Sequence, residues 1–370
     1  MSRPLNILVA YSDLKVGGVQ HMTTKLANAW VAAGHKVTIA LNKREPELEP
    51  YPLDPKVELI DFGGARVRQC LFSLARLLRE RQDIDILYSA TTVPNIVAVL
   101  ACKLSRTRAR LVISERDNPV KGFAALTARA DKLIWRLKPW AYKRADAVVC
   151  VSTPLADALA GFTGMQRDRI TVVHNPAEPD NDAFLSAPPP HPWLADKAVP
   201  VVIAAGRFHP QKDFPMLLRA FAQLRQHRNA RLVMLGDGEE RPALERLAQE
   251  LNITDDVLFA GMQKDIMTWL VHGDLFAMSS TFEGFGNVLV QALAAGTPIV
   301  STDCPDGPAE ILENGTYGEL VPVGDASAMA EAMGRMLDRP RDPDQLRQRA
   351  SAFSTARIAG RYQELFGALL

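Results

Sequence analysis

Short apolar runs alternate with longer amphipathic stretches along most of this 370-residue chain, and this alternation limits the folds open to it. Apolar runs of about four to eight residues bounded by turn residues are typical of buried strands, and helical periodicity marks the stretches between them. The predicted strands are residues 5–10, 36–41, 84–89, 110–114, 147–151, 199–205, 230–235, 257–259, 275–279 and 298–302. The predicted helices include residues 20–33, 72–81, 215–226, 241–251, 266–272 and 286–295. Strand–helix alternation of this kind predicts an α/β protein with parallel sheets.

The alternation is interrupted where prolines are concentrated, between residues 176 and 198. Proline removes a backbone donor and fixes φ, so regular structure is expected to stop there. The chain is also longer than the roughly 250–300 residues at which single cores stop growing, which predicts two domains. We expect a first domain over residues 1–175, a linker over 176–198, a second domain over 199–350 and a C-terminal helix over 351–370 that packs back on the first domain.

The composition excludes several functional classes. The net charge is +1, from 43 Lys and Arg against 42 Asp and Glu, so no general attraction to nucleic acid is expected. Away from the N-terminus the longest apolar stretch, residues 96–102, is far shorter than the ~20 residues of a membrane-spanning helix. We therefore expect a cytoplasmic protein, at most peripheral on the membrane. No CxxC pair, zinc spacing or DxD in a cleft-facing loop occurs, so neither metal nor cofactor is expected.

The loops after the predicted strands are where ligand chemistry is expected, because parallel sheets bind ligands at the carboxyl ends of their strands. Gly17 and Gly18 follow the first strand, where they let backbone amides approach an anion at a helix N-terminus, although a simple tight turn explains them equally well. Gly206, Arg207 and Lys212 follow the first strand of the second domain. An Arg–Lys pair at that position suits a diphosphate better than it suits solvated surface cations.

A glycine-rich loop precedes a helix at residues 281–295, TFEGFGNVLVQALAA. Gly284 and Gly286 stand just before the helix, whose free N–H groups can bind phosphate oxygens. Glu283 lies in the loop and is expected to point into a cleft, and Gln291 follows about two helical turns later. The plainer alternative is a charged loop followed by a solvated glutamine.

Basic residues outnumber acidic ones by seven to one between residues 121 and 144. At about 100° per residue, Arg129, Lys132 and Arg136 fall on one stripe of a helix, which Pro139 should kink or end. A basic amphipathic helix with tryptophans can lie on an anionic lipid surface, which would make a membrane a partner. An ordinary packed helix with a solvated basic face is the alternative.

Two strings in the second half carry a family resemblance: GRFHPQKDF at residues 206–214, and EGFGNVL followed by GTPIVSTDCP and GP within residues 283–308. They resemble the retaining glycosyltransferases of family 4, whose GT-B fold has two Rossmann-like domains facing across a central cleft. The resemblance covers essentially the whole chain and is closest to bacterial enzymes that extend lipid-linked or surface glycans. It implies metal-independent transfer of a hexosyl or N-acetylhexosaminyl group from a nucleotide-diphosphate sugar, expected to be UDP-linked, to a glycan hydroxyl with retention.

The resemblance also implies residue roles. Arg207 and Lys212 match the pair that neutralises the donor diphosphate, and Glu283 matches the first glutamate of an E-x7-E motif that contacts sugar hydroxyls, so these three are the expected catalytic residues. Gln291 stands where the second glutamate usually holds the ribose, and an uncharged amide roughly halves the strength of that hydrogen bond. The implied donor-binding residues are Gly17, Gly18, Gly206, Arg207, Lys212, Met262, Glu283, Gly284, Phe285, Gly286, Asn287, Val288, Leu289 and Gln291.

The first domain is expected to bind the acceptor. Glu115 and Arg116 follow a predicted strand and are candidates for acceptor contacts, although a structural ion pair is equally consistent with their position. The basic helix resembles the membrane-facing helix of relatives whose cations grip a lipid pyrophosphate, which implies a polyprenyl-diphosphate-linked acceptor held by Arg129, Lys132 and Arg136.

No convincing carboxylate nucleophile occurs, and the resemblance implies displacement on one face of the sugar, with the donor phosphate deprotonating the acceptor. A GT-B epimerase or phosphorylase is one alternative, without specific residues in its favour. A degenerate sugar-nucleotide-binding subunit is another, and only Gln291 favours it.

Overall fold

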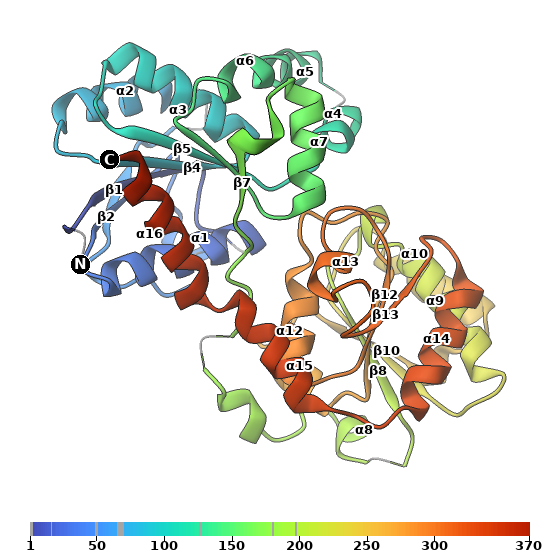
Figure 1. The fold of residues 1–370 in the computed structure, drawn as a ribbon. Helices are drawn as coiled ribbons and strands as arrows, with labels where there is room; N and C mark the ends of the chain where they lie inside the picture. The colour runs from blue at the N-terminus through green and yellow to red at the C-terminus, as the bar shows by residue number, and fades with distance from the viewer. Residues whose placement is uncertain are drawn as a thin grey trace. The chain divides into compact units, whose positions relative to one another are not determined.

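A computed structural model describes residues 3–15, 17–48, 51–64, 70–125, 128–179, 181–196 and 198–370. The chain divides into two compact units (Figure 1). Unit 1 comprises Met1–Pro176 together with Thr355–Leu370, and unit 2 comprises Ala177–Ser354. Unit 1 is therefore discontinuous in sequence, whereas unit 2 is one continuous segment.

The described part of unit 1 contains a seven-stranded parallel sheet in the order β3-β2-β1-β4-β5-β6-β7. The strands are β1 (Asn6–Tyr11), β2 (Lys36–Leu41), β3 (Glu58–Asp61), β4 (Ile86–Ala90), β5 (Arg110–Glu115), β6 (Ala147–Cys150) and β7 (Ile170–Val172). The helices are α1 (Gly18–Ala32), α2 (Leu71–Glu80), α3 (Thr92–Ser105), α4 (Pro119–Ala125), α5 (Arg129–Arg136), α6 (Lys138–Tyr142), α7 (Thr153–Thr163) and α16 (Thr355–Leu369). The strand order reverses between β1 and β4, the point at which such sheets admit ligands.

The core of unit 1 is completed by α16, which comes from the far end of the chain and lies beside α1 (Figure 1). The ring centroids of Tyr362 and Phe366 on α16 lie 5.9 and 5.4 Å from that of Trp30 on α1. Tyr362 also packs edge-on against Tyr88 of β4, at 5.5 Å between centroids. These aromatic contacts are worth about 0.5–1.5 kcal/mol each beyond the area they bury, so α16 is an integral part of this unit.

The described part of unit 2 contains a six-stranded parallel sheet in the order β10-β9-β8-β11-β12-β13. The strands are β8 (Val201–Ala205), β9 (Arg231–Leu235), β10 (Val257–Gly261), β11 (Leu275–Met278), β12 (Ile299–Thr302) and β13 (Glu319–Val321). The helices are α8 (Pro192–Ala195), α9 (Phe214–Arg225), α10 (Arg241–Glu250), α11 (Met267–His272), α12 (Asn287–Ala295), α13 (Pro308–Ile311), α14 (Ala326–Asp338) and α15 (Pro343–Ala350). The two Rossmann-like parallel sheets confirm the predicted α/β fold class, and the switch point of unit 2 lies between β8 and β11.

The proline-rich residues expected to form a linker lie in unit 2, where Phe184 and Leu194 are buried. His191 Nδ1 accepts a hydrogen bond of 3.2 Å from the Trp193 amide and caps the short helix α8. Pro192 occupies the first turn of that helix, where its missing N–H costs nothing. Pro192 thus starts a short helix within this unit.

The basic segment 121–144 is not one amphipathic helix, because α4, α5 and α6 are separate short helices within it. Pro139 lies in the first turn of α6, as a residue without an N–H prefers. Lys138, one of the seven basic residues of this segment, has no exposed surface. Its ammonium is paired with the Glu115 carboxylate in the interior.

Candidate active site

The loops after β8 and β11 form the centre of the candidate site in unit 2. These strands are parallel neighbours at the switch point, so the loops that follow them leave the same edge of the sheet. The first loop carries Lys212 and the second carries Glu283, and Lys212 Nζ lies 2.5 Å from Glu283 Oε1. The sheet topology thus brings together two of the three residues predicted to be catalytic.

Neighbouring hydroxyls hold this ion pair in place. Ser280 Oγ donates to Glu283 Oε1 at 2.6 Å, and Ser279 Oγ donates to the Lys212 carbonyl at 2.7 Å. The Lys212 and Glu283 side chains are only 19% and 9% exposed. Partial withdrawal from water strengthens their electrostatic interactions, so a diphosphate that reached Lys212 would gain more than it would at the open surface.

Glycines shape the loop that leads into α12. Gly286 precedes the helix with φ of 97°, in the left-handed region that favours glycine, and no side chain caps the helix start. A Cβ on Gly307 would lie 1.8 Å from the Phe285 carbonyl oxygen, so the two backbones can approach this closely only at a glycine. The Phe285 ring is buried against Phe353, at 5.6 Å between centroids. The first amides of α12 are therefore firmly placed, and the helix dipole favours an anion there.

The predicted donor-binding residues of the loop and of α12 differ in how far their side chains are buried. Phe285 and Leu289 are buried, so only their backbones can face a ligand, whereas Asn287 and Val288 are half-buried. Gln291 is half-buried in the second turn of α12. Glu283 and Gly284 lie before the helix begins, so a helical angle does not relate Glu283 to Gln291.

Arg207 is exposed, and its guanidinium makes no hydrogen bond or ion pair within the described residues. The loop that carries it is held by buried Phe208 and by two glycines after β9. Cβ atoms on Gly236 and Gly238 would lie 1.9 Å from the Gly206 carbonyl oxygen and 2.3 Å from that of Phe208. The sequence reasoning missed these two glycines, which the G-x-G spacing directly after a predicted strand could have revealed.

Met262 follows β10 at the same end of the sheet, because the Gly236 amide after β9 donates to the Gly261 carbonyl at 2.9 Å. The side chain of Met262 is 70% exposed. Its contact with a nucleotide base stays a prediction.

Gly17 and Gly18 lie between β1 and α1 in unit 1, at the switch point of that sheet. Gly18 is the first residue of α1, and no side chain caps this helix start. Gly17 has an extended backbone, and its carbonyl accepts from the His21 amide at 3.0 Å. The geometry is that of a helix start, whose dipole favours an anion.

Glu115 lies in the interior of unit 1 and is engaged there by several donors. Lys138 Nζ and the Tyr142 hydroxyl each lie 2.5 Å from Glu115 Oε2, and the Arg116 amide donates to Oε1 at 3.0 Å. Neither charged side chain of the pair has exposed surface. Burial raises the pKa of Tyr142 well above its ordinary value, and the Glu115 charge raises it further. The structure therefore places Glu115 in a structural ion pair rather than on an acceptor-binding surface.

Arg116 is also buried, and its guanidinium donates to Tyr88 of β4 at 2.7 Å and to Asn175. The next residue, Asp117, is exposed. Although part of the residue is exposed, protein atoms around its carboxylate reduce the hydration of that group. This reduced hydration and the neighbouring Glu115 charge raise the pKa of Asp117 to about 6. Asp117 is thus the carboxylate that this loop offers, and the sequence reasoning did not single it out.

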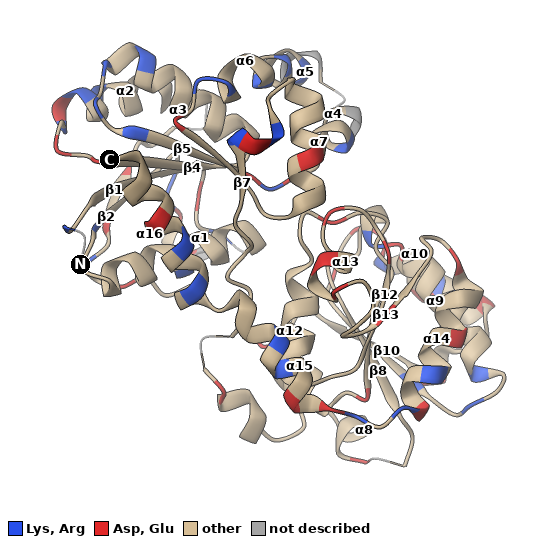
Figure 2. Cartoon of the chain, in the orientation of Figure 1, with Lys and Arg blue, Asp and Glu red and all other residues tan. Residues whose placement is uncertain are grey.

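Helix α5 carries basic residues (Figure 2), and apolar side chains at its end are exposed. Arg136 is exposed and Lys132 half-exposed, while the side chain of Arg129 lies outside the described part of the structure. Leu133 and Leu137 are 64% and 41% exposed. Among the described residues, no helix combines the length and apolarity needed to cross a bilayer, and no three His, Cys, Asp or Glu side chains gather as metal ligands would.

Two family models match the chain. The model for glycosyltransferase family 4 matches residues 16–181, and that for glycosyl transferases group 1 matches residues 199–339. Together they cover most of the chain and leave out mainly the proline-rich segment and the C-terminal residues.

Individual proteins show the same likeness. The lipopolysaccharide core biosynthesis glycosyltransferase LpsE of Rhizobium meliloti is 41% identical over 37% of this chain and 39% of its own length. A 4-alpha-N-acetylgalactosaminyltransferase of Campylobacter jejuni, which acts on a diphospho-undecaprenol glycan by its name, is 27% identical over 75% of this chain and 74% of its own length. The chain spans less than two thirds of several relatives, LpsE among them.

The likeness in structure extends over nearly the whole chain. Anabaena Alr3699/HepE, solved in complex with UDP and glucose, superposes with a TM-score of 0.80 at 20% identity. The superposition covers 98% of this chain and 100% of that one. Agreement of this extent identifies the fold as GT-B.

Proposed function

Because the chain belongs to the glycosyltransferases, with a family 4 domain over residues 16–181 and a group 1 domain over residues 199–339, we propose that it transfers a sugar from a nucleotide-diphosphate sugar to a hydroxyl of a glycan. We further propose that the donor is a UDP-linked hexose or N-acetylhexosamine and that the anomeric configuration is retained. The observation that carries the proposal is the pairing of Lys212 with Glu283 beside the uncapped start of α12.

The donor diphosphate fits the positive features of this site. Charge accumulates on the leaving nucleoside diphosphate as the glycosidic bond breaks, and groups fixed beforehand toward that charge stabilise the transition state. Arg207 offers a guanidinium fork that has no partner among the described residues, Lys212 a mostly buried ammonium, and α12 the positive end of its dipole. The residues of the chain supply this stabilisation in the proposal, which assigns no role to a metal ion.

Glu283 is proposed to accept hydrogen bonds from donor-sugar hydroxyls while its other interactions hold Lys212 in place. With Lys212 and Ser280 both on Oε1, the opposite carboxylate oxygen is left to face the sugar. In the proposed reaction the acceptor hydroxyl attacks from the face that the diphosphate leaves, and a phosphate oxygen takes the acceptor proton. The bond from sugar to diphosphate breaks as the bond to the acceptor oxygen forms, so the configuration is retained.

The acceptor is proposed to be a lipid-linked glycan that unit 1 meets at a membrane surface. The Campylobacter relative acts on a diphospho-undecaprenol glycan, and α5 offers Lys132 and Arg136 beside exposed Leu133 and Leu137. Cations beside apolar side chains are what an anionic lipid surface attracts. We propose that the protein acts on the cytoplasmic face of the membrane.

A degenerate sugar-nucleotide-binding subunit is the second candidate, favoured by Gln291 where the family pattern has a glutamate. The variant Gln291→Glu separates the two candidates. A large gain from near-zero turnover would favour the degenerate subunit, whereas a modest change from a measurable rate would favour the enzyme.

The first experiment measures thermal stability with UDP-, GDP- and ADP-sugars in excess EDTA. A ligand at 100 times its Kd adds about 2.7 kcal/mol of stability, so a selective shift would identify the nucleotide and show that no metal is needed. Arg207→Gln should reduce that shift, while Arg246→Gln, which removes an exposed cation from α10, should not. The absence of a shift with every nucleotide would contradict the proposed donor site, and proton NMR of the product would test retention.

A further inference from the structure

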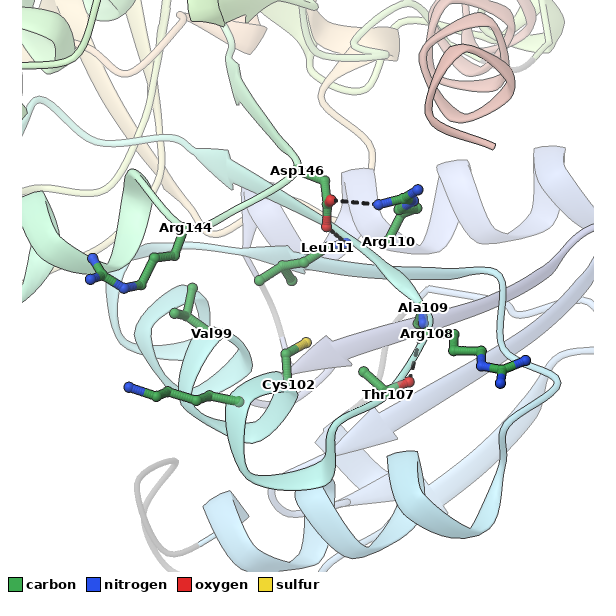
Figure 3. A pocket seen from close by; sticks show the side chains of 10 residues that line it. Val99, Cys102, Thr107, Arg108, Ala109, Arg110, Leu111, Arg144 and Asp146 are labelled. Carbon is green, nitrogen blue, oxygen red and sulfur yellow. Dashed lines mark hydrogen bonds and ion pairs between the residues drawn. The ribbon is translucent and has the colours of Figure 1, made fainter.

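A separate pocket lies in unit 1, at the edge of the sheet where β5 and β6 begin (Figure 3). Its volume is about 510 Å³. The walls come from the last turn of α3, the turn between α3 and β5, and the residues just before β6. This edge is opposite the carboxyl ends of the strands, where the glycosyltransferase chemistry is proposed.

The lining of this pocket is strongly cationic. Lys103, Arg108, Arg110 and Arg144 line it, and Asp146 is the one acidic residue among the described residues of its wall. The chain as a whole carries a net charge of only +1, so the composition does not account for this concentration of cations. These cations come from three segments of the chain, and each adds to the attraction of the pocket for an anion.

The carboxylate of Asp146 does not neutralise the group. Its Oδ1 lies 3.2 Å from Arg110 Nη1, and its Oδ2 accepts the Leu111 amide at 2.8 Å. Arg108 has no hydrogen bond or ion pair within the part of the chain that the structure describes. Its guanidinium is therefore available to a ligand.

The two other cations lie over an aromatic ring and have no carboxylate partner in the described structure. Lys103 Nζ and the Arg144 guanidinium carbon are 5.8 and 4.5 Å from the centroid of Trp140 on α6. A cation–π contact fixes the position of a cation without removing its charge. Arg144 Nη1 also donates to the Trp140 carbonyl at 2.9 Å. The remaining N–H groups of Arg144 and the Lys103 ammonium keep the capacity to bind an anion.

Hydrogen bonds fix the turn that carries Arg108. The Thr107 amide donates to Ser105 Oγ at 3.3 Å, and the Ala109 amide donates to Thr107 Oγ1 at 3.2 Å. Arg106 ends α3 in the left-handed conformation, with φ of 55°, and its side chain is not part of the pocket. A fixed turn lowers the entropy cost of holding the cations around a ligand.

We propose that this pocket binds a phosphate group carrying two or more negative charges, outside the donor and acceptor sites. The guanidinium forks of Arg108 and Arg110 match phosphate oxygens in pairs, while Lys103 and Arg144 add charge. The phosphate comes either from a soluble ligand or from a lipid headgroup. The inference rests on unit 1 and does not depend on the proposed transferase activity.

The soluble arm of the test is calorimetric titration with inorganic pyrophosphate at 50 and 150 mM salt. Arg108→Gln combined with Arg110→Gln should weaken one binding event at least tenfold, because two charge-assisted forks are lost. Arg108→Gln by itself removes no hydrogen bond or ion pair of the described structure, so this variant should fold normally and bind pyrophosphate more weakly. Arg106→Asn is the control, because it removes a neighbouring cation that lies outside the pocket. Asparagine tolerates the positive φ of this position, so the variant should fold and should bind pyrophosphate with unchanged affinity.

The lipid arm measures flotation with vesicles of phosphatidylcholine that contain or lack phosphatidic acid. Capture that needs phosphatidic acid and is lost in the double variant assigns the pocket to a headgroup. Pyrophosphate binding lost in the double variant without vesicle capture assigns it to a soluble phosphate. If the double variant binds both pyrophosphate and vesicles as the unchanged chain does, or if the unchanged chain binds neither, the proposal is overturned.

Discussion

Replacing Glu283 by glutamine should separate two functions of one carboxylate. Its Oε1 is 2.5 Å from Lys212 Nζ and 2.6 Å from Ser280 Oγ, so it stabilises unit 2 in the absence of a donor. In the proposed reaction it also orients the donor sugar. Glutamine keeps the shape and an acceptor oxygen but removes the charge.

The size of the effect follows from this environment. A hydrogen bond to a charged group contributes about 1.5–3 kcal/mol, and Lys212 is too buried for water to replace its partner fully. For a unit of this size that loss lowers Tm by about 3–12 °C. Because Glu283 is the carboxylate paired with Lys212 in the described structure, a nucleoside diphosphate then meets no competing carboxylate there. It should bind as well as before or more tightly and restore much of the lost stability. Transfer should fall at least tenfold, because the sugar is no longer oriented.

The assay combines thermal melting with and without nucleoside diphosphate, calorimetric titration and turnover with the sugar donor. Glu250→Gln is the matched control, because Glu250 is exposed at the end of α10 and lies outside the site. An unchanged Tm, or diphosphate affinity that falls together with turnover, would refute the reasoning. Either result would mean that the carboxylate does not compete with phosphate for Lys212.

Three further predictions concern stability, loop geometry and thiol chemistry. Lys138→Met leaves the Glu115 carboxylate buried without its cation and should lower the free energy of unfolding, measured in urea, by about 3–5 kcal/mol. Adding Glu115→Gln should recover part of this loss. A loss below about 1 kcal/mol for Lys138→Met would contradict the pairing. Gly307→Ala places a Cβ where the Phe285 carbonyl lies and should abolish nucleotide-induced thermal shifts, so an unaltered shift would show that the loop can move aside. Burial raises the pKa of Cys102 to about 12, so its alkylation rate in the native protein should still be rising at pH 11, whereas the rate of an ordinary thiol, with a pKa of about 8.5, has levelled off by then.

The sequence predicted the central strands well because buried parallel strands are continuous apolar runs. The ends of β2 agree with the prediction, and those of β8 differ only at the start. The short outer strands β3, β7 and β13 were not predicted. Each lies at or near an edge of its sheet and carries polar residues, so no long apolar run marks it.

The pairing of Lys212 with Glu283 was predictable in outline, because both residues follow neighbouring strands of a parallel sheet. The burial of Lys138 was not predictable from periodicity. Its partner Glu115 lies on another element, and only tertiary packing places a carboxylate there to compensate the charge. For the same reason the sequence predicted Glu115 to be a loop residue that can contact the acceptor, although the side chain lies inside the unit.

The contribution of α16 to unit 1 has a consequence for biosynthesis. During translation, residues 1–176 are synthesised first. Tyr362 and Phe366, which pack against Trp30, follow only after all of unit 2 has been made. Unit 2 is continuous and can complete its own core as it emerges. The domain made second therefore completes its core before the domain made first. Until α16 is made, Trp30 and Tyr88 lack the aromatic partners that cover them, and chaperones can bind there.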